Sequence, residues 1–263
     1  MGEKDARRRR AGMGLGGGTS LQDIIAHAQE SAEAWEGDEG SIVTAEELRT
    51  RDAARRHDAH IRNTFAKGEL KMTFGTFSPS TDAQSAAKLA CEKFAQDVAG
   101  RSDLLTGMML SSPPGRGKTH LAMATLLEVA SPDCDVRVCA VPSFLASIKA
   151  SFSKNTPGDP DQILSWHKQA DLLLLDDLGA ERETEWAIET LYLLVDHRVK
   201  HELPTIITTN LTPTEFVARA NGKFTKNYGD DPIYCSRIYS RLRGMVIGNI
   251  HLLDGDDYRA RVN

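Results

Sequence analysis

The sequence has few cysteines and no long apolar run, and these two absences argue against several classes of protein. Its 263 residues contain only 4 cysteines, Cys91, Cys134, Cys139 and Cys235. No two of them form a C-x-x-C pair, so neither a disulfide framework nor a zinc site is expected. No apolar stretch reaches the roughly 18 residues of a membrane-spanning helix, and the N-terminal segment lacks the apolar centre of a signal peptide. We therefore expect a cytoplasmic protein without a membrane partner.

An excess of basic residues is also lacking. The formal net charge is −5, and 40% of the residues are hydrophobic. This balance argues against a protein coated by nucleic acid, although a locally basic channel would not show in the total. The length and the apolar fraction suffice for one α/β domain of ordinary size with an extension.

The stretch Ser111–His120, SSPPGRGKTH, predicts a phosphate-binding loop. It lies between an apolar run and a helical pattern at Lys118–Ala130, which is the strand–loop–helix context that this motif requires. Backbone N–H groups of the loop would point at the phosphates, Lys118 would reach the β- and γ-phosphates, and the Thr119 hydroxyl would bind Mg²⁺. The expected nucleotide-binding residues are Pro114, Gly115, Arg116, Gly117, Lys118, Thr119 and His120.

This loop departs from the usual pattern at one position. Ser112 stands where G-x-x-x-x-G-K-[ST] has its first glycine. If that position required a positive φ, serine would be disfavoured by about 1 kcal/mol or more, which would weaken nucleotide binding. An ordinary glycine-rich turn before a helix is the alternative interpretation of the stretch.

Residues 1–71 contain no catalytic motif and are expected to form a tail followed by a small helical extension that binds a partner. Residues 1–20 combine an arginine run with glycines, a composition typical of a flexible tail, and the run could also touch nucleic acid. Helical patterns follow at 20–36 and at 44–67. Their apolar stripes are too thin for a core of their own, which favours docking on a partner protein over docking on the ATPase domain.

Residues 72–263 are expected to form the nucleotide-binding domain. A linker containing Phe74 and Phe77 comes first, followed by a helical pattern at Ala83–Val98. Strand patterns then recur at Gly107–Leu110, Val136–Val141, Leu172–Asp176, Thr205–Thr209 and Met245–Leu252. Because helical patterns separate the first four, we expect an α/β fold with a five-stranded parallel sheet covered on both faces.

Two carboxylates, Asp176 and Asp177, follow four consecutive leucines. The carboxyl ends of parallel strands are where an open α/β sheet binds its ligands. Asp176 would therefore bind Mg²⁺, Asp177 would orient or deprotonate the attacking water, and Asn210, after the next strand, would hold the γ-phosphate or that water. A solvated turn is the alternative for the acid pair. The phosphate loop, the acid pair and the polar end of the next strand, in this order along the chain, are typical of an additional-strand P-loop ATPase.

Five segments resemble, in order and spacing, the AAA+ helicase loaders of the DnaC and DnaI type and, slightly less closely, the transposition ATPase IstB: GRGKTHLA, LLLLDDLG, LPTIITTN, SRIYSRLRG and DGDDYRARV. The resemblance covers about residue 72 to the end. It implies a homo-oligomeric ring or spiral that binds ATP and Mg²⁺ at sites shared between subunits. Arg241 matches the arginine finger of the family, Arg237 is its companion or substitute, and Arg259 matches the sensor-2 arginine.

The resemblance also implies a grip on single-stranded DNA. The positions that match the pore-lining residues of the loaders are Lys149, Phe152, Thr184 and Trp186. Stacking of a base on an aromatic ring contributes about 1–3 kcal/mol, and lysine binds phosphate without reading sequence. The alternative is that Phe152 lies in the core and that Trp186 packs under the following helix.

Three functions are weighed on these features. The first is an ATPase that binds a hexameric replicative helicase through its N-terminal helices and places it on single-stranded DNA. The second is an IstB-like ATPase that regulates DNA transposition. The N-terminal extension and the helix that ends in ASFSK favour the first over the second. The third, a P-loop small-molecule kinase, is disfavoured by the C-terminal arginines and by the lack of an arginine-rich lid segment.

Overall fold

The computed structural model divides into two compact units, Met1–Arg49 and Thr50–Asn263, and the described residues belong to the second. They are Arg55, His57 and residues 59–100, 107–152, 159–181, 184–221 and 232–258, with the side chains of 232–235 excepted. The predicted tail, the helix at 20–36, most of the helix at 44–67, and Arg259 lie outside them. Among the described helices, none is both long and apolar enough to cross a lipid bilayer.

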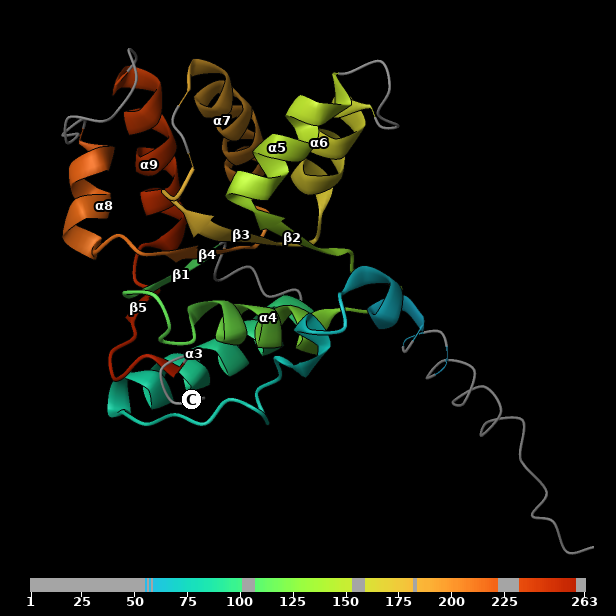
Figure 1. The fold of residues 1–263 in the computed structure, drawn as a ribbon, viewed down its shortest axis with the longest axis vertical. Coiled ribbons are helices and arrows are strands. Elements are labelled where there is room, and N and C mark those ends of the chain that lie inside the picture. The colour runs from blue at the N-terminus through green and yellow to red at the C-terminus, as the bar shows by residue number, and fades with distance from the viewer. Residues whose placement is uncertain are drawn as a thin grey trace, which may run out of the picture. The chain divides into compact units, whose positions relative to one another are not determined.

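A five-stranded parallel sheet forms the centre of this unit, as predicted (Figure 1). The strands, in spatial order, are β2 (Val136–Ala140), β3 (Leu172–Leu178), β4 (Thr205–Thr209), β1 (Gly107–Ser111) and β5 (Ile250–Leu252). Thr209 pairs with Ser111 on one side and with Leu178 on the other. The carboxyl ends of β1, β4 and β3 therefore meet at one edge of the sheet.

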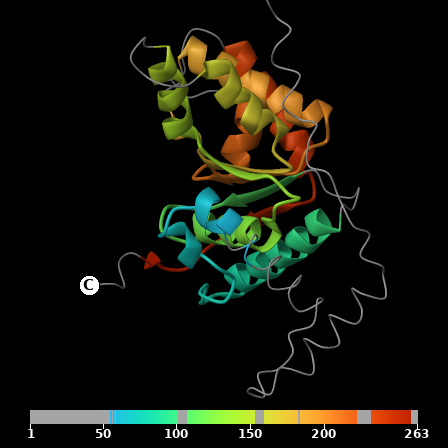
Figure 2. The same cartoon turned by 90° about the vertical axis from the view of Figure 1, so that its right-hand side faces the viewer.

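The helices cover both faces of the sheet, α3 and α4 on one face and α5 to α9 on the other (Figures 1 and 2). Their bounds are α3 (Asp82–Ala99), α4 (Lys118–Val129), α5 (Val141–Ser151), α6 (Pro160–Gln169), α7 (Glu185–Lys200), α8 (Pro213–Ala220) and α9 (Pro232–Val246). Alternate residues of β3 enter the two cores: Leu172 and Leu174 pack with α3 and α4, whereas Leu173 and Leu175 pack with α5, α7 and α9. Burial on both faces explains the continuous run of leucines.

The last strand is shorter than predicted. Met245 and Val246 belong to the end of α9, and only Ile250–Leu252 form β5. Both residues are buried, and a short apolar run does not reveal whether it forms a buried helix end or a strand. Gly248, with a φ of 80°, lies in the turn between the two elements, where a residue with a side chain would be strained.

The end of the predicted extension packs on the ATPase domain. Residues 59–64 are helical, and Phe65, 4% exposed, belongs to the core formed with α3 and α4. Ile61, Leu70 and Met72 pack against the same core, and Leu70 belongs to a short 3₁₀ helix, η1 (Glu69–Lys71). The described part of the extension thus docks on the ATPase domain, which the sequence pattern had made less favoured than docking on a partner protein.

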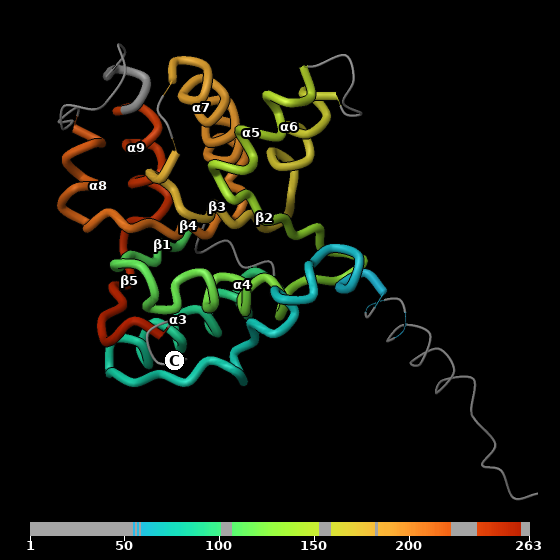
Figure 3. The backbone as a smooth tube through the Cα atoms, viewed as in Figure 1, coloured from blue at the N-terminus to red at the C-terminus, as the bar shows by residue number. Residues whose placement is uncertain are grey.

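The segment after β5 returns to the start of α3 (Figure 3). Gln84 Nε2 donates a hydrogen bond to the carbonyl of Asp254 at 2.9 Å. Thr81, whose hydroxyl caps α3 by accepting from the Gln84 N–H, also donates to the Asp254 carboxylate. These bonds place the end of the described chain beside the linker that precedes α3.

Candidate nucleotide-binding site

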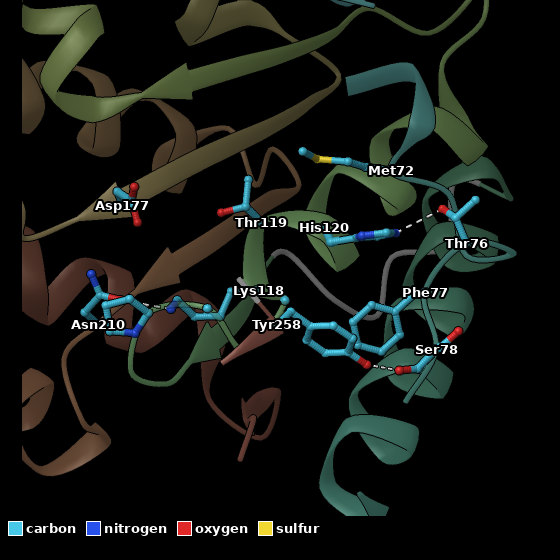
Figure 4. A pocket seen from close by; sticks show the side chains of 13 residues that line it. Met72, Thr76, Phe77, Ser78, Lys118, Thr119, His120, Asp177, Asn210 and Tyr258 are labelled. Atoms are coloured by element: carbon cyan, nitrogen blue, oxygen red, sulfur yellow. Dashed lines mark hydrogen bonds between the residues drawn. The ribbon is translucent and has the colours of Figure 1, made fainter. Parts of the chain in front are cut away.

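The carboxyl ends of β1, β3 and β4 open into a cavity of about 450 Å³. Two groups of residues line it on different sides (Figure 4). The first, here the polar wall, consists of Pro114, Gly115, Gly117, Lys118, Thr119, Asp177 and Asn210. The second, here the aromatic wall, consists of Met72, Thr76, Phe77, Ser78, His120 and Tyr258.

Lys118 is buried at the start of α4, with 5% of its surface exposed. Its Nζ donates to the carbonyls of Ser112 at 2.8 Å and Pro113 at 3.1 Å, and to Asn210 Oδ1 at 2.9 Å. These oxygen acceptors hold the ammonium group at the loop, and the Asp176 carboxylate also interacts with it electrostatically. An ammonium group fixed at this point of the cavity can meet the oxygens of an anionic ligand.

Ser112 occupies its place in the loop without backbone strain. Among the described residues other than glycine, a positive φ occurs only at Asp177 and Glu202. The Ser112 side chain is buried, and its hydroxyl donates to the Pro113 carbonyl at 2.9 Å. The missing glycine of the usual pattern therefore carries no penalty here.

Two glycines of the loop are required by both conformation and space. Gly115 and Gly117 have φ values of 80° and 92°. A Cβ atom at Gly117 would lie 2.6 Å from Phe77 Cε2, and one at Gly115 would lie 1.9 Å from Asp257 Oδ1. Both glycines line the cavity, so their backbone can face a ligand on the cavity side, which fits a polyphosphate cradle. Arg116, between the two glycines, is half-buried and does not line the cavity.

Asp176 meets the Thr119 hydroxyl at the edge of the sheet. Its Oδ1 accepts from Thr119 Oγ1 at 2.9 Å and from Thr208 Oγ1 at 2.6 Å. Burial raises the pKa of the Asp176 carboxyl, while these hydroxyls act in the opposite direction. A carboxylate and a hydroxyl side by side are the oxygen ligands that Mg²⁺ prefers, so this pair fits the ion.

Asp177 is turned away from its neighbour. The register of β3 against β4 shifts between Leu175 and Leu178, and Asp177 has a φ of 56°. Its N–H donates to Thr208 Oγ1 at 2.9 Å. The irregularity leaves Asp176 hydrogen-bonded to Thr119, whereas Asp177 lines the cavity (Figure 4). Thr208 contacts both acids but was not named among the predicted site residues. The feature of the sequence that indicates it is the pair of threonines at the end of the strand pattern TIITTN.

The aromatic wall joins the linker before α3 to the segment after β5. Phe77 lies edge-on to His120 at 5.3 Å between ring centroids and 6.3 Å from the ring of Tyr258. Tyr258 donates its N–H to the Gly115 carbonyl at 2.9 Å and its hydroxyl to the Ser78 carbonyl. His120 Nε2 donates to the Thr73 carbonyl at 2.9 Å, since a carbonyl only accepts. Of these residues, only His120 was predicted at the site.

The predicted arginines lie away from the cavity or outside the described residues. Arg241, on α9, donates through Nε to Asp196 Oδ1 and through Nη2 to the Tyr192 hydroxyl, both at 2.9 Å. Arg237, one turn earlier on α9, is exposed. Neither residue lines the cavity of its own chain, and Arg259 is not described.

The structure brings two of the predicted DNA-binding residues together. Phe152, at the end of α5, is 63% exposed, and its ring lies 6.3 Å from that of Trp186 with an interplanar angle of 77°. Phe152 is therefore not a core residue, whereas Trp186 packs partly against the core, as the alternative suggested. Lys149 is exposed on α5, and the Thr184 hydroxyl caps α7 by accepting from the Ala187 N–H.

The fold and the site define the class of the protein. A strand inserted between the strand of the phosphate loop and the strand of the acid pair, with a buried lysine at the loop, is the arrangement of an AAA+ P-loop ATPase. The chain belongs to the family of IstB-like ATP binding proteins, whose model matches residues 19–226. Among its relatives are the replicative helicase loaders DnaC and DnaI, to which it is similar.

The relatives of the chain include both replicative helicase loaders and an ATP-binding protein in an insertion sequence. The chain is 24% identical over 231 residues to the replicative helicase loader DnaC of Escherichia coli (strain K12), covering 87% of this chain and 86% of the relative. It is 28% identical over 233 residues to an ATP-binding protein in an insertion sequence of Mycobacterium tuberculosis, covering 86% and 84%. A crystal structure of the DnaC helicase loader shares the fold, with a TM-score of 0.57, 22% identity, and coverage of 72% of this chain and all (100%) of that one.

These matches correct one inference from the sequence. The family match begins at residue 19, and the relatives from both settings align over more of the chain than residues 72–263 contain. The N-terminal extension therefore does not by itself favour a helicase loader over a transposition ATPase.

Proposed function

We propose that this ATPase binds a hexameric replicative helicase and places it on single-stranded DNA. The exposed ring of Phe152 beside Trp186 is the observation that carries the proposal. An exposed aromatic ring is costly to leave in water, whereas a stacked base would cover it and contribute about 1–3 kcal/mol. Lys149 is exposed one turn before Phe152 on α5 and would meet the phosphate of the same strand.

The polar wall would hold the triphosphate of ATP. Lys118 supplies the buried positive charge, and Gly115 and Gly117 present their backbone to the cavity, where N–H groups can face phosphate oxygens. Thr119 and Asp176 would hold Mg²⁺, which neutralises charge on the phosphates when it is bound. Asp177, inside the cavity, would orient the attacking water, and Asn210 keeps the Lys118 side chain in place through its hydrogen bond. The aromatic wall would hold the adenine base.

The catalytic site would be completed by a second subunit of a homo-oligomer. Arg241 lies on α9, outside the cavity of its own chain, with 31% of its side chain exposed. A guanidinium from a neighbour would stabilise charge on the transferring phosphoryl group, an effect of roughly 10³-fold or more in rate. Arg237 would support it, and Arg259 would contact the nucleotide of its own subunit.

An IstB-like function in DNA transposition is the second candidate, supported by the 28% identity to the insertion-sequence protein. The two functions differ in DNA substrate and partner. A loader binds single-stranded DNA in preference to duplex and associates with a hexameric helicase, whereas the alternative requires duplex DNA and a transposase.

Fluorescence anisotropy with single-stranded and duplex oligonucleotides tests the DNA-binding part. We expect Phe152→Ala to weaken binding of single strands about tenfold, from the loss of one stacked base. Leu89→Ala is the matched control, since Leu89 is similarly exposed, at 68% against 63% for Phe152, but lies on α3, on the other face of the sheet. Tighter binding of duplex DNA by the wild type, or equal effects of the two substitutions, would contradict the proposal.

Co-purification with the hexameric helicase tests the partner. Deleting residues 1–49 removes one compact unit and leaves Phe65 in the core of the other, so we expect a folded ATPase that no longer binds the helicase. A truncated protein that still co-purifies would place the docking surface on the ATPase domain. A full-length protein that binds a transposase and no helicase would support the alternative.

A further inference from the structure

The guanidinium of Arg241 is fixed by two residues of α7 that lie one helical turn apart. Nε donates to Asp196 Oδ1 and Nη2 to the Tyr192 hydroxyl, both at 2.9 Å. The Arg241 Cζ atom also lies 4.8 Å from the centroid of the Tyr192 ring. Three contacts of different kinds thus fix both the position and the plane of one partly exposed side chain.

The two hydrogen bonds involve one edge of the planar guanidinium group and do not involve the Nη1 end of the group. An arginine carries five N–H donors in a rigid plane, and the Nε–H and one Nη2–H lie along the same side edge. That edge faces Asp196 and Tyr192. Nη1 makes no hydrogen bond within the part of the chain that the structure describes. The end of the fork, formed by Nη1 and the second Nη2–H, matches the spacing of phosphate oxygens.

The carboxylate that holds Arg241 does not cancel the positive charge of the cluster. Asp196 Oδ2 lies 2.7 Å from Lys200 Nζ, so one carboxylate is shared by two cations. Hydrogen bonds from Lys200 and, to a lesser degree, from Arg241 lower the pKa of Asp196, which is therefore ionised at neutral pH. The three side chains together keep a formal charge of about +1, so the cluster remains attractive to an anion.

We infer that Asp196 and Tyr192 are positioning residues that hold Arg241 with the end of its fork available to the phosphates of a nucleotide bound by a neighbouring subunit. The inference rests on the proposed function, in which two subunits share the catalytic site, and it names the residues that position the arginine of that site. Because the arginine is ordered before assembly, its rotamer entropy is not lost when the subunits meet. Misplacement of such a group by about 1 Å can lower a rate as much as 10²-fold.

The decisive experiment places each substitution in a chosen subunit. A Lys118→Ala subunit keeps Arg241 but has a damaged phosphate loop, and an Arg241→Ala subunit has the reverse. Mixed, they should recover part of the ATPase activity through the pairing of an intact loop with an intact arginine. Tyr192→Phe, which keeps the ring, and Asp196→Ala are then added to one of the two subunits at a time, with nucleotide binding and co-assembly measured in parallel.

We expect an asymmetric result. In the Lys118→Ala subunit, which supplies the arginine, Asp196→Ala should lower the recovered kcat about tenfold to a hundredfold, with the KM for ATP unchanged. In the Arg241→Ala subunit the same substitution should have little effect. Asp196→Asn keeps an oxygen acceptor for Nε and should retain more activity than Asp196→Ala. Glu189→Gln, which changes an exposed carboxylate elsewhere on α7, is the control.

The outcomes separate the inference from the function on which it rests. No recovery in the mixture that lacks α7 substitutions, with co-assembly confirmed, would overturn the shared site and the inference together. Recovery that α7 substitutions lower equally from either subunit would show that Asp196 and Tyr192 only stabilise the packing of α7 on α9. Recovery that they leave unchanged, or increase, would show that the contacts do not position Arg241 for catalysis.

Discussion

The two walls of the cavity are built in different ways. The polar wall comes from the loop and the start of α4, which follow β1, and from the ends of β3 and β4. The parallel register of these strands fixes the loop, Asp177 and Asn210 relative to one another. The aromatic wall comes from the margins of the described chain, where Tyr258 and Ser78, 180 residues apart in the sequence, share a hydrogen bond. The phosphate loop and the adjoining strand ends thus carry the charges, whereas the rings, apart from His120 on α4, lie on segments outside the sheet and its helices.

This difference assigns separate tasks to the walls. Charged and hydroxyl groups on strand ends suit the phosphates and the reacting water, which demand fixed geometry. Rings on a linker and on a C-terminal segment suit a base, whose flat faces tolerate small displacements. Substitutions in the polar wall should therefore affect hydrolysis or phosphate binding, and substitutions in the aromatic wall should affect only ligands that carry a base.

The largest effect is expected at Asp177. Asp177→Asn keeps the size of the side chain but removes the group that would take up or orient the proton of water, so hydrolysis should fall roughly 10²–10⁴-fold. ATP affinity should change little, since Lys118 and the loop are untouched. Steady-state ATPase assays and calorimetric titration of ATP measure the two quantities. Hydrolysis by the variant at the rate of the wild type would remove Asp177 from the reaction.

Lys118→Ala should have the next largest effect. It removes charge-assisted hydrogen bonds to phosphate of about 1.5–3 kcal/mol, or roughly tenfold to a hundredfold in Kd. Both ATP and inorganic triphosphate should lose affinity equally, because the lysine meets only the part that they share. Lys88→Ala, which changes a lysine of α3 outside the cavity, is the control. Selective loss of ATP binding would place the lysine at the base and not at the phosphates.

The polar wall could be predicted because each of its parts is local. Lys118 and Thr119 stand at fixed offsets in one motif, and the apolar run before Asp176 occurs in a series of alternating strand and helix patterns, which favours a buried strand. The separation of the two acids could not be predicted in this way. The irregularity that turns Asp177 into the cavity depends on the pairing of β3 with β4 and on Thr208, which belongs to another strand.

The aromatic wall could not be predicted because its parts meet only in the folded chain. Phe77 lies in a linker without periodicity, and Tyr258 follows a strand of three residues. The same limit applies to Phe65, whose segment contains too few apolar residues to show that it completes the core of α3 and α4. The contacts of Arg241 with α7 likewise depend on the packing of two helices that are distant in the sequence.

Tyr258→Ala should produce a smaller and more selective effect than the changes in the polar wall. Loss of one aromatic contact with the base costs about 0.5–1.5 kcal/mol of binding free energy, which raises the Kd of ATP roughly threefold to tenfold. The affinity for inorganic triphosphate should remain that of the wild type. Tyr258 is only half-buried, so thermal unfolding should show a folded domain. An equal loss for both ligands would mean that the Tyr258 side chain supports the phosphate loop and not the base, since alanine keeps the backbone N–H that binds the Gly115 carbonyl.

Restoring the usual glycine in the loop should have the smallest effect. Ser112 has no positive φ that glycine would relieve, and its hydroxyl lies 3.3 Å from Lys118 Nζ, a long contact that contributes little beyond the carbonyl bonds of the same lysine. Ser112→Gly should therefore change the Kd of ATP by less than about threefold, which corresponds to roughly 0.6 kcal/mol. The added freedom of glycine in the unfolded chain should lower the free energy of unfolding by about 0.5–1 kcal/mol. Calorimetric titration and thermal unfolding measure these two changes. A gain in affinity of tenfold or more would show that the loop adopts a different backbone around the phosphates, in which position 112 requires glycine after all.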